Sequence, residues 1–146
     1  MHRHTSFVVP VFALAAGLVF AACDSSTSNS SCGSGTAPSL VGTYALVSYT
    51  IGLTTVTTAD GATGELRFHA STYGASITIP IGGAPEVIAD SGSYTVTGAK
   101  CISQNSITGQ PTFTGTFTLS GTASGAVFTV SGTAAGQVVA SAWTKQ

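Results

Sequence analysis

The chain has 146 residues, of which only 6% are charged, and its formal net charge is −1. A charge this small and scattered excludes a nucleic-acid-binding surface, because such a surface needs clustered Lys and Arg to displace the counterions of the phosphate backbone. The absence of a basic patch in the sequence also excludes electrostatic adhesion to anionic lipid. The length left after the first 22 residues suits one domain.

The first 22 residues have the layout of an export signal. A short basic start precedes an uncharged apolar stretch, residues 7–22, that is too short to span a bilayer comfortably. The segment Phe20-Ala21-Ala22-Cys23 resembles the bacterial lipobox, in which a signal peptidase cuts before a cysteine that carries lipid. The resemblance implies that the mature protein begins at an acylated Cys23 and is exported and anchored to a membrane of the bacterial cell envelope. The alternative is a plain secretory signal cut near Ala22.

Residues 23–38 are predicted to form a flexible tether, since the segment from Asp24 to Pro38 has no large apolar residue that could join a core. If Cys23 carries lipid, Cys32 and Cys101 remain as a pair in an oxidising compartment, where we expect them to form a disulfide. A bond between them would close a loop of about 70 residues, contribute roughly 4 kcal/mol and fasten the tether to the domain. The alternative is two unrelated free thiols.

Residues 39–146 are predicted to form one all-β domain. Glycine and proline interrupt the chain too often for helices of ordinary length, and apolar residues alternate with polar ones. We expect eight to ten strands among the segments 40–50, 53–58, 64–70, 72–81, 85–89, 92–97, 101–107, 112–119, 126–131 and 137–144. A sequential antiparallel sheet of this size loses its exposed edges by closing, which predicts an up-and-down β-barrel; a β-sandwich is the alternative.

The second half of this domain repeats a strand-and-turn unit. Residues 117–125 recur eleven residues later as 128–136, and a shorter version lies at 94–99. We expect the glycine near the middle of each copy, such as Gly121 and Gly132, to end its strand and enter a turn.

Short motifs from Leu40 to Lys145 resemble those of bacterial lipocalin-like domains. Residues 40–48 resemble their first strand, with Tyr44 in place of the usual Trp, and the runs 64–68, 72–73, 91–96 and 143–145 are also similar. The resemblance implies a barrel that is closed at one end and holds a small apolar molecule. It also implies that Lys145 covers the ring of Tyr44.

The alternation predicts which bulky side chains point to one side of the sheet. They are Tyr44, Leu46, Leu66, Phe68, Ile77, Ile79, Tyr94, Val96, Phe113, Phe117, Phe128, Val130 and Trp143. An eight-stranded barrel is just wide enough to be filled by side chains or to hold one small ligand, so this set forms either a plug or the wall of a cavity.

Two functions follow from these alternatives. A cavity predicts a binding protein for a small hydrophobic ligand, with Phe68, Tyr94, Phe113 and Phe117 as the ligand-binding residues. A filled barrel predicts a structural or protein-interaction lipoprotein of the envelope.

No residue pattern predicts catalysis, a metal site or a cofactor. His69 is the only histidine after the signal, and it shares a strand face with Glu65 and Arg67, which we expect to be solvated. Glu86 and Asp90 would lie about 13 Å apart along a strand, and we expect both to be surface charges. The sequence also has no nucleophile elbow and no spaced set of metal ligands. We therefore expect a protein that is not an enzyme.

Overall fold

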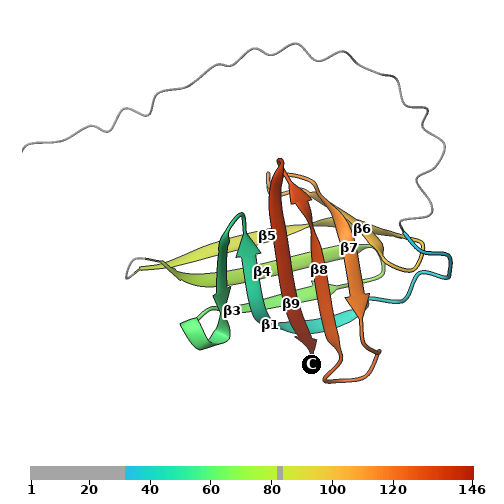
Figure 1. Ribbon diagram of the computed structural model, residues 1–146, viewed down its shortest axis with the longest axis horizontal. Helices are drawn as coiled ribbons and strands as arrows, with labels where there is room; N and C mark the ends of the chain where they lie inside the picture. Colours follow the sequence, from blue (N-terminus) through green and yellow to red (C-terminus); the bar gives the residue numbers. More distant parts are fainter. Residues whose placement is uncertain (1–31, 82–83) are drawn as a thin grey trace, which may run out of the picture.

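The structure is a computed structural model that describes residues 32–81 and 84–146 (Figure 1). The predicted signal sequence and Cys23 lie outside the described residues. The strands are β1 (Gly42–Ile51), β2 (Thr54–Thr57), β3 (Thr63–Phe68), β4 (Thr72–Ile81), β5 (Ala84–Thr97), β6 (Cys101–Ser106), β7 (Phe113–Leu119), β8 (Val127–Ala134) and β9 (Gln137–Lys145). The only helix in these residues is the 3₁₀ turn η1 (Thr58–Asp60), and nothing helical there is long and apolar enough to cross a membrane.

The sheet closes on itself. Strands pair antiparallel in chain order, and β1 also pairs with β9 from Tyr44 opposite Lys145 to Ile51 opposite Val139. Along its other edge β1 pairs first with β3 and then with β2, so these two short strands occupy one position in the barrel. The fold is therefore an eight-stranded antiparallel up-and-down barrel, which confirms the predicted fold class and excludes the β-sandwich.

The turn η1 connects β2 to β3, so the two short strands follow one another along the same edge of β1. The carboxylate of Asp60 accepts hydrogen bonds from the hydroxyl of Thr57 at 2.7 Å and from its backbone N–H at 2.9 Å. These bonds lower the pKa of the Asp60 carboxyl. Gly61 follows in the left-handed conformation, with φ of 85°, and directs the chain into β3.

Two strands are longer than the sequence predicts. The expected segments 85–89 and 92–97 form the single strand β5, which continues through Asp90 and Ser91. Within it, Gly92 lies where the backbone of β6 comes close, and any Cβ would collide with the carbonyl oxygen of Asn105. The expectation that Gly132 ends its strand is also wrong. β8 continues to Ala134, and its turn is made by the next two residues, which both have positive φ.

The two ends of the barrel differ. The closed end carries the β3–β4, β5–β6 and β7–β8 turns, together with the segment that leads into β1. The open end carries the β1–β2, β6–β7 and β8–β9 turns (Figure 1).

Five aromatic side chains fill the closed half of the interior and are named here the aromatic cluster: Tyr44, Phe68, Tyr94, Phe117 and Phe128. The Phe68 ring centroid lies 4.8 Å from that of Tyr94 and 5.6 Å from that of Phe128. Phe128 in turn lies 5.6 Å from Tyr44 and 5.8 Å from Phe117. Edge-on and tilted ring pairs at these separations are favourable beyond the area they bury. The closed half is therefore a plug.

The alternation predicts the interior well. Every bulky residue expected to face inward is buried or, in the case of Val96 and Val130, packs partly buried against the core. The structure adds Leu40, Tyr73 and Ile102 to the buried set.

The segment before β1 is bonded to the closed end. Cys32 forms a disulfide with Cys101, the first residue of β6, which confirms the predicted pairing. The carbonyl oxygen of Cys32 also accepts hydrogen bonds from the backbone N–H groups of Ala99 at 3.0 Å and Lys100 at 3.1 Å. The part of the predicted tether from residue 32 onward is thus held against the β5–β6 turn.

The start of β1 is held by contacts at its first aromatic residue. Tyr44 is completely buried and donates a hydrogen bond from its hydroxyl to the carbonyl of Leu40 at 2.8 Å, and burial raises the pKa of this phenol. The ammonium of Lys145 lies 5.7 Å from the Tyr44 ring centroid, within cation–π distance, and donates to the carbonyl of Val41 at 3.0 Å. This is the placement that the family resemblance implies.

We expect reduction of the Cys32–Cys101 bond to lower the free energy of unfolding by roughly 4 kcal/mol, because the unfolded chain regains the freedom of a loop of about 70 residues. Urea unfolding with and without a reductant measures the change. The variant carrying Cys32→Ser and Cys101→Ser should have the lower stability in both conditions. Equal stability of the oxidised and reduced wild-type protein would contradict the prediction.

Candidate functional site

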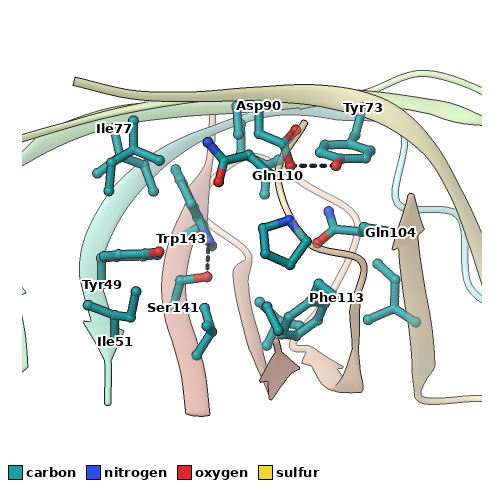
Figure 2. A pocket seen from close by; sticks show the side chains of 18 of the residues that line it. Tyr49, Ile51, Tyr73, Ile77, Asp90, Gln104, Gln110, Phe113, Ser141 and Trp143 are labelled. Carbon is teal, nitrogen blue, oxygen red and sulfur yellow. Dashed lines mark hydrogen bonds between the residues drawn. The ribbon is translucent and has the colours of Figure 1, made fainter. Parts of the chain in front are cut away.

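The open half of the barrel contains a cavity of about 280 Å³ (Figure 2). Its lining is mainly aliphatic and aromatic and comes from every strand of the barrel wall except β2. The polar lining residues in the described part of the chain are Asp90, Gln104, Gln110, Gln137 and Ser141, with the hydroxyls of Tyr49 and Tyr73. An apolar concavity with a few polar groups is the usual form of a small-molecule site.

The inner end of the cavity rests on the aromatic cluster. Leu66, Phe128 and Trp143 line it, and each is at most 4% exposed. The indole N–H of Trp143 donates to the hydroxyl oxygen of Ser141 at 2.7 Å, which fixes the indole against the wall. Because that oxygen is the acceptor here, the Ser141 hydroxyl proton is left to donate elsewhere.

A bulge in β1 brings Tyr49 into the cavity. Leu46 pairs with Trp143 but Ser48 pairs with Ala142, so β1 has one extra residue, Val47, between these pairs. The extra residue reverses the inward and outward alternation, which is the usual effect of a bulge. Tyr49 therefore points inward (Figure 2), where burial raises the pKa of its phenol.

On the wall of the cavity across from Tyr49, Asp90 is the centre of a group of hydrogen bonds. Its carboxylate accepts hydrogen bonds from three hydroxyls: Tyr73 at 2.6 Å, Ser106 at 2.6 Å and Thr108 at 2.8 Å. The pKa of the Tyr73 phenol is raised strongly, first by burial and then by its bond to Asp90 and the nearby negative charge. Hydrogen bonds from hydroxyls to a carboxylate are short and strong, so these side chains form one rigid unit.

The same unit positions the β6–β7 loop at the cavity mouth. The hydroxyl oxygen of Ser106 accepts bonds from the backbone N–H groups of Thr108 at 3.0 Å and Gln110 at 3.1 Å. Ser106 thus connects the loop backbone to Asp90. The loop in turn carries Gln110 and Pro111, which both line the cavity; Gln110 lies beside Asp90 in Figure 2.

Two facing glycines make room for an aromatic wall residue. Gly115 of β7 and Gly132 of β8 are register partners, and a Cβ on either would come within 2.8 Å of the Phe113 ring. Glycine at both positions lets that ring lie against the bare backbone beside the cavity.

The structure separates the residues predicted to bind a ligand. Phe113 lines the cavity, whereas Phe68, Tyr94 and Phe117 belong to the aromatic cluster. The expectation that Asp90 is a surface charge is wrong, because it points inward on β5 together with Ile88.

The outer face of β3 is as predicted. Glu65 and Arg67 are exposed and form an ion pair, with the Arg67 Nε 2.6 Å from the Glu65 carboxylate. His69 is exposed beyond the end of the strand, and only its backbone takes part in the fold, accepting a bond from the Tyr94 hydroxyl at 2.8 Å. Within residues 32–81 and 84–146, no three His, Cys, Asp or Glu side chains gather as a metal site would require.

Tyr49, Tyr73, Asp90, Ile102 and Ser141 are among the cavity residues that sequence reasoning missed. Asp90 has the same strand parity as Tyr94 and Val96, so treating 85–97 as one strand would have placed it inside. Tyr49 gives no such signal, since the Val47 bulge that turns it inward has no glycine or proline to mark it.

Comparison of the chain with protein families, curated proteins and solved structures finds no match.

We expect Ser106→Ala to loosen the β6–β7 loop, since it removes one bond to Asp90 and two acceptor bonds from the loop backbone. Hydrogen exchange should show faster exchange of the Thr108 and Gln110 amides, with an overall loss of about 1–3 kcal/mol. Ser103→Ala is the matched control, because Ser103 lies on the same strand with outward parity. Unchanged protection of the two loop amides in Ser106→Ala would contradict this role.

Proposed function

We propose that this protein is a lipid-anchored lipoprotein with a lipocalin-like barrel that binds a small apolar molecule in its open half. The cavity is the observation that carries the proposal. It lies between a filled closed half and an open end, and its lining is mainly apolar. A structural lipoprotein with a filled barrel is the less favoured alternative, because the interior side chains leave this space open.

The cavity limits the size of the ligand. A volume of about 280 Å³ is at the lower end of the range for small-molecule sites. A small ligand such as a short-chain amphiphile suits a site of this size.

The proposed lipid anchor determines how the barrel is oriented relative to the membrane. The disulfide fixes residue 32 at the closed end, and only eight residues separate it from Cys23 in the sequence. An acylated Cys23 therefore places the closed end nearest the membrane and the open end away from it. Ligand would enter from the aqueous side.

We expect Cys23→Ser to move the protein from the membrane fraction to the soluble fraction, because the substitution removes the acylated sulfur. Fractionation followed by immunoblotting measures the distribution. The matched control is Cys32→Ser, which removes a different thiol and should leave the protein in the membrane. A Cys23→Ser protein that remains in the membrane would contradict lipidation at this residue.

The cavity itself is tested by filling it. Ala75 of β4 lines the cavity, whereas Ala89 of β5 is exposed. With 1-octanol as probe, we expect the wild-type protein and the control Ala89→Phe to gain about 1.4 kcal/mol at ten times Kd, a rise of several degrees in Tm. Ala75→Phe should fold but lose this gain, because its ring occupies the ligand space.

Thermal unfolding at a series of octanol concentrations provides the measurement. An equal octanol-dependent rise in Ala75→Phe and wild type would place binding outside the cavity. No rise in the wild type with octanol would contradict ligand binding of this chemical class.

A further inference from the structure

The charged residues around the cavity indicate which class of polar head group a bound amphiphile would carry. Asp90 is the only charged residue among the described residues that line it. The basic side chains of the described domain lie elsewhere: Arg67 is paired on the outer face of β3, and Lys100 and Lys145 are at the closed end. A carboxylate in the cavity would therefore find a like charge and no counter-charge.

The Asp90 carboxylate is satisfied by the protein itself. Tyr73, Ser106 and Thr108 all donate hydroxyl protons to it, which satisfies its acceptor oxygens but adds no positive charge. These bonds hold the carboxylate in place on the β5 wall. A ligand carboxylate would therefore meet it as a like charge.

Hydrogen-bonding groups suited to an uncharged head lie on the other wall. Tyr49 and Ser141 are cross-strand partners on β1 and β9, and both face the cavity. The Ser141 oxygen already accepts the indole N–H of Trp143, which leaves its proton for a ligand oxygen. The Tyr49 phenol stays protonated, since burial raises its pKa, and can donate in the same way. Together they form a pair of donors opposite Asp90 (Figure 2).

We propose that the cavity selects an uncharged amphiphile, whose apolar chain lies among the aliphatic lining and whose hydroxyl or carbonyl oxygen bonds to Tyr49 and Ser141, and that Asp90 rejects the corresponding carboxylate. This inference rests on the proposed binding function and adds the head-group class. Two like charges about 10 Å apart at an effective dielectric of about 20 weaken binding about tenfold. Loss of water from the carboxylate weakens it further.

The test compares 1-octanol with octanoate at about pH 8, where the fatty acid is ionised. Full-length protein carrying Cys23→Ser is used, so that no acyl chain competes for the cavity, and calorimetric titration gives each Kd. We expect octanol to bind about tenfold or more tightly than octanoate. Asp90→Asn, which keeps an acceptor oxygen for its hydroxyl partners, should reduce the ratio of the two dissociation constants about tenfold, because it removes the repulsion between like charges.

Glu65→Gln is the matched control, since it removes one negative charge from the outer face of the barrel and should leave the preference unchanged. Equal binding of octanol and octanoate by the wild type would overturn the head-group inference while leaving the binding function in place. A ratio of the two dissociation constants that is unchanged in Asp90→Asn would also overturn it. Binding of neither compound would overturn the binding function itself.

Tyr49→Phe tests the donor wall independently. It removes one hydroxyl, keeps the ring, and should weaken octanol binding several-fold while the melting temperature without ligand stays near that of the wild type. Unchanged octanol affinity in this variant would overturn the assignment of Tyr49 as a head-group donor.

Discussion

Phe68 of β3 and Phe128 of β8 come from strands that do not pair, and their rings meet with centroids 5.6 Å apart in the closed half of the barrel. Through them Tyr44, Tyr94 and Phe117 join one cluster, whose members come from β1, β3, β5, β7 and β8. Truncating a buried phenylalanine typically costs 3–5 kcal/mol, so this cluster is a major source of stability. The filled side of the core is therefore concentrated in the closed half.

That division explains why the open half can remain hollow. Its wall carries small residues at several inward positions, including Ala75, Ala134 and Ser141, and the Gly115–Gly132 pair lets Phe113 lie close to the backbone. The polar side chains around the cavity are hydrogen-bonded to one another: Ser141 accepts a bond from Trp143, and Ser106 donates one to Asp90. No buried side-chain nitrogen or oxygen in the described residues lacks a hydrogen-bond partner. These hydrogen bonds therefore hold the side chains that line the cavity in a defined arrangement.

Much of the fold could be predicted from the sequence because the barrel obeys simple alternation over most of its length. Tyr44, Leu66, Phe117 and Trp143 all face inward as their strand parity indicates, and Cys32 and Cys101 form the predicted disulfide. One failure comes from glycine: Gly132 marks a close approach of the neighbouring backbone, although glycine is equally the signal for a turn. The other is the expected gap at residues 90–91, through which β5 continues.

The candidate site was harder to predict than the fold. Alternation identifies inward residues but does not say which half of the barrel is filled, so Phe113 and Phe68 look alike in sequence although only Phe113 reaches the cavity. Tyr49 depends on a one-residue bulge, which is set by the register of β1 against β9. Such register is a long-range property of the closed barrel and leaves no local pattern.

The central claim is that a barrel plugged at one end binds its ligand at the other. The most direct measurement is an NMR titration of the isotope-labelled Cys23→Ser protein with 1-octanol, with the shifts assigned residue by residue. Our account predicts saturable changes at Tyr49, Ile102 and Ser141, with the Phe68 and Tyr94 signals unchanged. Changes centred on Phe68 and Tyr94, or no saturable change at any residue, would contradict it.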